Sequence, residues 1–100
     1  MYKDKGLIKA FNGTKFKIVS YLNEGDSIIF TTSRNSKKYS EFKKNLKAKI
    51  EIDKNNTVEY DITIIEDEKE VDALFKKLKD TKAILPFIPR KHKIIVRYSI

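Results

Sequence analysis

The sequence predicts an α+β protein that is mainly β, with six strands forming an antiparallel sheet that rolls toward a barrel and two helices. Three observations predict this fold. Apolar and polar residues alternate along most of the chain, turn-forming pairs separate the alternating segments, and the apolar period becomes helical in two places. Hairpin connections favour antiparallel neighbours, and amphipathic helices cover faces that a sheet leaves open. The predicted order is β-β-β-α-β-β-α-β.

The first half of the chain begins with three predicted strands, at residues 6–11, 14–22 and 27–32. Asn12-Gly13 separates the first two and is a strong hairpin signal. A second turn cluster, residues 23–26, precedes the third strand, which is rich in β-branched residues. Along the second strand, Phe16, Ile18, Ser20 and Leu22 share one face, and Lys15, Lys17, Val19 and Tyr21 share the other.

A helix is predicted from Ser36 to about Lys47, because Tyr39, Phe42 and Leu46 follow one another at helical spacing. The Ser36 hydroxyl can accept a hydrogen bond from a free amide of the first turn, so Ser36 is the predicted N-cap. The opposite face of this helix is rich in lysine.

The second half contains a third hairpin, a second helix and a last strand. Residues 48–53 and 57–65 alternate around a turn at 54–56. Asp67 and Glu70 have the spacing of a capping box, and the helix they open has an apolar stripe. Pro86 and Pro89 indicate an irregular segment before a strand at residues 93–100.

Length and composition restrict the classes of function. One hundred residues, 40% of them hydrophobic, suit a single domain spanning residues 1–100. The absence of cysteine excludes disulfides, thiolate nucleophiles and cysteine-ligated metals, and a single histidine, His92, argues against a zinc site. No apolar run is long enough to cross a membrane, and no signal peptide is recognised. We therefore expect a cytoplasmic protein without a membrane partner.

The formal net charge is +8, and the whole excess lies in the first half of the chain. Residues 1–50 carry 12 Lys and Arg against 4 Asp and Glu, whereas residues 51–100 carry 10 of each. A field of this sign attracts the phosphates of nucleic acid, an anionic membrane or a phosphorylated cofactor. The alternative is a lysine-rich solvated surface that maintains solubility.

The segment Thr31-Thr32-Ser33-Arg34-Asn35-Ser36-Lys37-Lys38 is the most informative part of the sequence. A strand ends in hydroxyl residues, a short polar loop follows, and a helix begins with serine and two lysines. Free amides at a helix N-terminus, hydroxyl donors and cations together can hold a phosphate group. The competing interpretation is that Ser36 only caps the helix and that the lysines only interact with solvent.

The spacing Thr32-x-x-x-Ser36-Lys37-Lys38, followed after six residues by Asn45, resembles the signature of the pyridoxamine-5′-phosphate-oxidase-like, flavin-binding split barrels. The predicted strand order is also similar to that of the family, so the resemblance covers nearly the whole chain. It implies a split barrel that binds FMN at the interface of a homodimer, acting as an oxidoreductase on a small-molecule substrate. Asn45-Leu46 is instead similar to the nitroreductase-like branch, which implies a deazaflavin.

The resemblance also implies roles for individual residues. Thr31 and Thr32 would line the flavin ring and the ribityl chain. Ser36, Lys37 and Lys38 would hold the phosphate, and Lys17 would supply the basic residue that the family places on the preceding strand. No catalytic residue and no metal site is predicted.

Two alternatives stay open. One is a split barrel that has lost its cofactor and serves as an interaction domain. The other is a nucleic-acid-binding module, which the basic first half and the cluster at residues 90–93 favour. His92 is interpreted as an exposed loop residue, and the acidic residues near Asp67 as the start of a helix.

Overall fold

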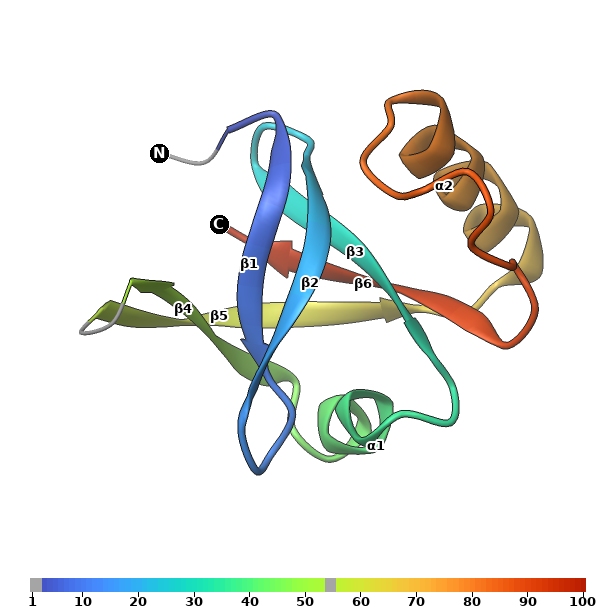
Figure 1. Cartoon of the computed structure of the whole chain (residues 1–100). Coiled ribbons are helices and arrows are strands. Elements are labelled where there is room, and N and C mark those ends of the chain that lie inside the picture. Colours follow the sequence, from blue (N-terminus) through green and yellow to red (C-terminus); the bar gives the residue numbers. More distant parts are fainter. Residues whose placement is uncertain (1–2, 54–55) are drawn as a thin grey trace.

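The computed structural model describes residues 3–53 and 56–100 and confirms the predicted fold class: a six-stranded antiparallel split barrel with two helices. The strands close in the order β1-β2-β3-β6-β5-β4, as Figure 1 shows. The strands are β1 (Lys5–Phe11), β2 (Phe16–Asn23), β3 (Ser27–Ser33), β4 (Lys47–Asp53), β5 (Asn56–Ile65) and β6 (Lys93–Ser99). The helices are α1 (Lys37–Lys44) and α2 (Glu68–Asp80).

The pairing of β2 with β3, like that of β1 with β4, is much shorter than the other pairings of the barrel. Its register consists of Leu22 opposite Ile29 and Asn23 opposite Ile28. By contrast, β3 pairs with β6 over its whole length, from Ser27 to Ser33. Beyond Leu22 and Ile29 the two strands diverge, so that the barrel wall opens on the side from which the chain enters α1.

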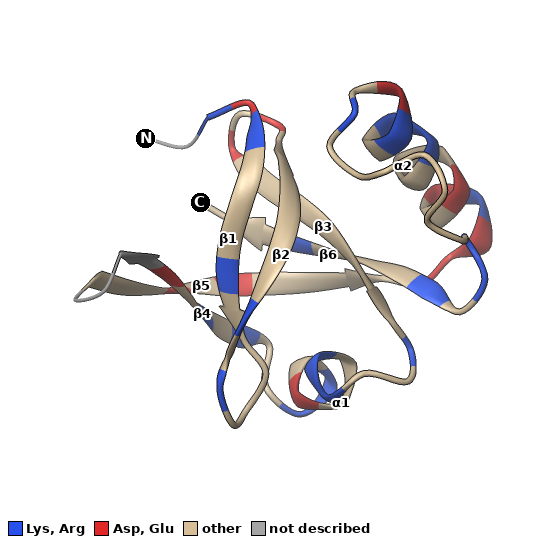
Figure 2. Ribbon diagram, viewed as in Figure 1, with Lys and Arg blue, Asp and Glu red and all other residues tan. Residues whose placement is uncertain are grey.

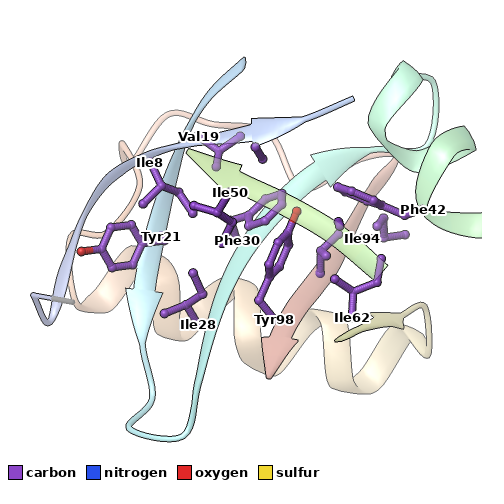
Figure 3. Close-up of a cluster of buried hydrophobic side chains, with 13 residues drawn as sticks. Ile8, Val19, Tyr21, Ile28, Phe30, Phe42, Ile50, Ile62, Ile94 and Tyr98 are labelled. Atoms are coloured by element: carbon purple, nitrogen blue, oxygen red, sulfur yellow. The ribbon is translucent and has the colours of Figure 1, made fainter. Parts of the chain in front are cut away.

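The interior of the barrel holds the larger of two apolar clusters, drawn in Figure 3. Side chains from all six strands contribute to it, and Phe42 of α1 closes it at one end. The Phe42 ring packs edge-on against Phe30 and Tyr98, with centroid separations of 6.2 Å to each. The Tyr98 hydroxyl is buried with no hydrogen-bond partner among the described residues, and this burial raises the pKa of Tyr98.

The second apolar cluster lies outside the barrel, beneath α2. It consists of Leu22, Ile29, Ile65, Val71, Leu78, Ala83 and Ile95. Strand residues adjacent in sequence point to opposite faces of the sheet. Ile29 and Ile95 therefore face α2, whereas their neighbours Phe30 and Val96 lie in the barrel interior. One run of buried residues thus supplies both clusters.

Both predicted helix starts are confirmed. The Ser36 hydroxyl accepts a hydrogen bond from the Tyr39 amide at 3.2 Å, and the Asp67 carboxylate accepts one from the Glu70 amide at 3.1 Å. α1 ends at Lys44, three residues before the predicted end, because Asn45 adopts an extended conformation and Leu46 joins the sheet through a bond from the Ile62 amide. The turn predicted at residues 54–56 includes 54 and 55, which lie outside the described residues.

The first hairpin is confirmed, but its turn is longer than the Asn12-Gly13 pair predicts. The strands end at Phe11 and resume at Phe16, which leaves four residues in the loop. The Asn12 side-chain carbonyl accepts hydrogen bonds from the Thr14 and Lys15 amides, both at 2.9 Å. Gly13 has φ of +94°, and a Cβ there would lie 2.7 Å from the Glu41 carboxylate, so this position requires glycine.

No helix among the described residues is long and apolar enough to cross a membrane.

Candidate functional site: a groove between β2 and β3

A groove of about 360 Å³ lies where β2 and β3 diverge, and we call it the β2–β3 groove. Its volume is in the range of small-molecule sites. One side is formed by the two strands, another by the chain that follows α2, and the start of α1 lies at one end. Its lining residues are Ile18, Val19, Ser20, Thr31, Thr32, Ser33, Ser36, Lys38, Ile84, Leu85, Ile88 and Lys93.

Four of the six residues predicted to bind a cofactor line this groove: Thr31, Thr32, Ser36 and Lys38. Lys17 is exposed on β2, next in sequence to the lining residue Ile18. It is close enough for its positive charge to lower the pKa of Lys38. Lys37 is exposed and does not line the groove. Lys38 therefore lines the groove and Lys37 does not, because the side chains of adjacent helix residues point about 100° apart.

The predicted hydroxyl donors already form hydrogen bonds within the protein. The Thr31 hydroxyl donates to the Ile94 carbonyl at 2.9 Å. The Ser36 hydroxyl donates to the Ser33 carbonyl at 2.9 Å and accepts from the Tyr39 amide, and the Thr32 hydroxyl lies 3.0 Å from it. These bonds fix the loop before α1. Ser36 thus caps the helix, as one sequence interpretation holds, and Lys38 is a donor of the groove for which no hydrogen bond to a described residue is found.

The lysines at this end of the groove have no nearby carboxylate. Within the described chain, the lysines that lie within 4.0 Å of an acidic side chain are Lys9, Lys43, Lys47 and Lys77. Burial lowers the pKa of Lys38 below its ordinary value, and the positive charge of Lys17 lowers it further. Figure 2 shows basic residues on α1 and on the neighbouring hairpin. An anion bound here would relieve the repulsion between these two lysines.

Arg34, the cation of the loop before α1, is not free to bind an anion in the groove, because acidic side chains of this chain already pair with it. Its guanidinium donates to Glu66 at 3.2 Å and to Glu68 at 3.4 Å. Glu66 also accepts a 2.6 Å hydrogen bond from the Tyr39 hydroxyl. The cations near the start of α1 thus form two groups. Arg34, on what we call the compensated side, is paired with acidic side chains of this chain. Lys38, on the groove side, has no such partner among the described residues.

Sequence reasoning missed the apolar wall of the groove. Ile84, Leu85 and Ile88 come from the proline-containing segment, and Ile18 comes from the outer face of β2. The signal for Ile18 was present: the Val19 and Tyr21 face enters the barrel, which turns Ile18 outward to 65% exposure. No pattern in the sequence places residues 84–88 opposite β2, because the two segments are distant along the chain and share no strand pairing.

No protein-family model matches this chain, and no curated protein matches it. Among solved structures, its fold is similar to that of a Listeria innocua protein named "Putative Pyridoxamine 5'-phosphate oxidase". The TM-score is 0.64 at 12% sequence identity, over 96% of this chain and 82% of the other. This similarity supports the split-barrel fold that the spacing around Thr32 and Ser36 suggested.

The groove combines an aliphatic wall with a cationic end. This arrangement can hold a ligand whose flat or apolar part packs against isoleucine and leucine and whose anionic group meets Lys38 and Lys17. The described lining contains no histidine and no carboxylate that could transfer a proton near neutral pH.

Proposed function

We propose that this chain binds FMN, or a related deazaflavin, in the β2–β3 groove and acts as a small oxidoreductase. The observation that carries this proposal is Lys38, a partly buried lysine that lines an aliphatic groove without a carboxylate partner among the described residues and lies near the exposed Lys17. The cofactor phosphate would lie against these lysines, and its ring system would lie along Ile18, Ile84 and Ile88. The similarity in fold to a protein named as an oxidase supports the oxidoreductase function.

A bound flavin would supply hydride or electron transfer, for which the protein needs no acid–base pair of its own. The chain's residues would bind and orient it. The hydrogen bonds of Thr32 and Ser36 hold the start of α1 in place, and this fixes the helix position from which Lys38 extends. The small-molecule substrate would approach the ring from the open side of the groove.

Titration with FMN, followed by quenching of flavin fluorescence, tests this function. Wild-type protein should bind one flavin per chain. Lys38→Ala should weaken binding by about 1.5–3 kcal/mol, the value of a hydrogen bond to a charged group. Lys37→Ala is the matched control, because Lys37 is the adjacent exposed lysine outside the groove, and it should leave affinity within about twofold.

Two results would contradict the proposal. Equal losses in both variants would indicate a general effect of positive charge, as in a nucleic-acid-binding module, for which steep salt dependence of DNA or RNA binding is the further test. A wild-type protein that binds neither FMN nor a deazaflavin would support the cofactor-free interaction domain.

We also propose that the chain forms a homodimer through an outer apolar patch of four side chains. Leu7, Ile18, Leu85 and Phe87 are each 57–76% exposed. Ile18 and Leu85 both line the groove, and the β1–β2 register places Leu7 diagonally opposite Ile18. Four such side chains expose on the order of 400 Å². A standard dimer buries roughly 800 Å² per partner, about 60% of it apolar, so the patch supplies most of that area.

Sedimentation equilibrium tests this association. Leu7→Glu should convert the dimer to a monomer without changing the groove, since Leu7 does not line it. Leu46→Glu is the matched control, because Leu46 is 62% exposed on the connection between α1 and β4, outside the patch. A wild-type monomer at high concentration, or equal behaviour of the two variants, would overturn the assignment.

A further inference from the structure

The segment between α2 and β6, residues 83–92, forms one wall of the β2–β3 groove, and we call it the strap. In Figure 1 it runs from the end of α2 to the start of β6. At its start, the Ala83 and Ile84 amides donate to the Leu78 carbonyl at 2.8 and 3.3 Å. At its end, the His92 carbonyl accepts from the Arg34 amide at 2.8 Å. The backbone between these anchors forms two described hydrogen bonds, both local: the Ile88 amide donates to the Leu85 carbonyl at 3.2 Å, and the Lys93 amide donates to the Arg90 carbonyl at 3.1 Å.

The end of the strap is held mainly by one side chain, Arg90. Its Nε donates to Asp72 at 2.7 Å, and its Nη2 donates to Glu68 at 2.7 Å. Both acceptors belong to α2, so Arg90 spans two successive turns of this helix. The remaining Nη1 donates to the Lys93 carbonyl at 3.3 Å, which orients the guanidinium relative to the start of β6.

Glu68 connects the strap to the loop before α1. One of its oxygens accepts from Arg90 of the strap, and the other accepts from Arg34 of the loop before α1 at 3.4 Å. The direct bond between the Arg34 amide and the His92 carbonyl joins the same two segments. The strap and the loop before α1 therefore both contact the first turn of α2.

We propose that Arg90 is a positioning residue of the groove: its ion pairs with Asp72 and Glu68 hold the strap against β2 and β3 and thereby set the width of the site. Arg90 does not line the groove and would act through Ile84, Leu85 and Ile88. Where the inference concerns ligand affinity, it rests on the proposed flavin function; where it concerns the strap's position, it stands on the contacts alone.

Two features make this strap dependent on Arg90. The described backbone hydrogen bonds of its middle stay within the strap and the start of β6, so they do not attach the strap to β2 or β3. His92 has φ of +62°, a left-handed conformation that residues other than glycine adopt uncommonly and at a cost in free energy. Removing the ion pairs of Arg90 with Asp72 and Glu68 would therefore let the strap open locally, while the strands of the barrel stay paired.

Amide hydrogen exchange measures the position of the strap without any ligand. In Arg90→Gln, the amides of Arg34, Ile88 and Lys93 should exchange roughly five- to tenfold faster, while barrel amides such as that of Ile95 should not change. Arg97→Gln is the matched control, because Arg97 also donates through Nε and Nη2 to a carboxylate, Glu24, away from the strap. Unchanged exchange in Arg90→Gln, or equal acceleration in both variants, would overturn the proposal.

The kinetics of FMN binding then test the effect on the site. Arg90→Gln should bind FMN roughly three- to tenfold more weakly, chiefly through faster dissociation, with an unchanged melting temperature for the barrel. Faster exchange with unaltered FMN affinity would show that the strap does not shape the site and would overturn the positioning role. If wild-type protein does not bind FMN, the proposed function fails, and exchange alone decides whether Arg90 holds the strap.

A charge-reversed pair provides rescue. Arg90→Asp combined with Asp72→Arg restores opposite charges at the Nε contact, and exchange of the Lys93 amide should return toward the wild-type rate. If the double variant exchanges as fast as the single variants, the contact between Arg90 and Asp72 does not hold the strap, contrary to the proposal.

Discussion

Two lysines on the same short helix, Lys38 and Lys43, are in opposite electrostatic environments. The Tyr39 side chain and then the Glu66 carboxylate raise the pKa of Lys43 above its ordinary value. Burial and the charge of Lys17 lower the pKa of Lys38. The sequence presents both as members of one lysine-rich helix. The structure shows that one belongs to a compensated charge network and that the other faces a groove.

The compensated side extends beyond Lys43. Glu66 accepts from Tyr39 and Arg34, and Glu68 and Asp72 continue the network to Arg90. Each cation there has an acid of this chain as its partner, so the network joins α1, α2 and the strap. The groove side lacks such acids, and its cations would be neutralised only by an added anion. The difference distinguishes charges that organise the fold from charges available to a ligand.

We expect the largest effect on FMN affinity when an acidic side chain is introduced next to the lysines of the groove side. Lys38→Glu places a carboxylate beside Lys17, so the protein supplies the anion itself. FMN affinity should fall by more than about 100-fold, because an attraction is replaced by a repulsion. The free energy of unfolding should stay the same or rise by roughly 0.5–1 kcal/mol. Fluorescence titration and urea denaturation measure the two quantities.

Lys37→Glu controls for the change in net charge, since it alters the overall charge equally at the adjacent exposed position. If Lys37→Glu weakens FMN binding as strongly as Lys38→Glu, the two sides of the helix do not differ in the way the contacts indicate.

A smaller effect is expected on the compensated side. Glu66→Ala removes the acceptor of the 2.6 Å bond from Tyr39 and of the 3.2 Å bond from Arg34. Because Glu66 is partly exposed, solvent replaces some of this loss, and the free energy of unfolding should fall by about 1–2 kcal/mol. Urea denaturation measures it. Glu59→Ala serves as a control, since Glu59 is exposed on β5 and forms no ion pair among the described residues. A stability unchanged from wild type would show that the network does not support the fold.

The parts of this molecule that sequence could predict are those governed by local pattern. Alternation located the strands, helical spacing located α1, and Ser36 and Asp67 marked the helix starts. These features depend on residues within one or two turns of each other, so a single sequence contains the required information.

The environment of the candidate site depended on contacts distant in sequence. Arg34 belongs to the predicted phosphate-binding loop, yet Glu66 and Glu68, more than 30 residues away, occupy its guanidinium. Ile84 and Ile88 reach the groove only because α2 packs outside the barrel and returns the chain toward β2. The sequence therefore located the loop and four residues that line the groove, but it missed the apolar wall and did not separate Lys37 from Lys38.

The smallest expected effect is a dependence of FMN affinity on pH in the alkaline range. The pKa of Lys38 is lowered in the free protein, and a bound phosphate would raise it, so the complex holds this proton more tightly. Affinity should thus be highest below the free-protein pKa of Lys38 and decline as the pH rises through it toward the pKa in the complex. Lys93 lines the groove and Lys17 lies beside it; neither has a carboxylate partner among the described residues, and both should retain part of the binding.

Replacing Lys38 by arginine separates the loss of the Lys38 proton from other effects of pH, because a guanidinium stays charged throughout the alkaline range. We expect wild-type affinity to fall by roughly three- to tenfold as the pH rises through the pKa of Lys38, while the affinity of Lys38→Arg stays nearly constant over the same interval. Parallel pH profiles would mean that the proton lost is not that of Lys38. The low pKa of this lysine would then reflect its burial alone, and the contrast with Lys43 would describe the fold without marking a phosphate site.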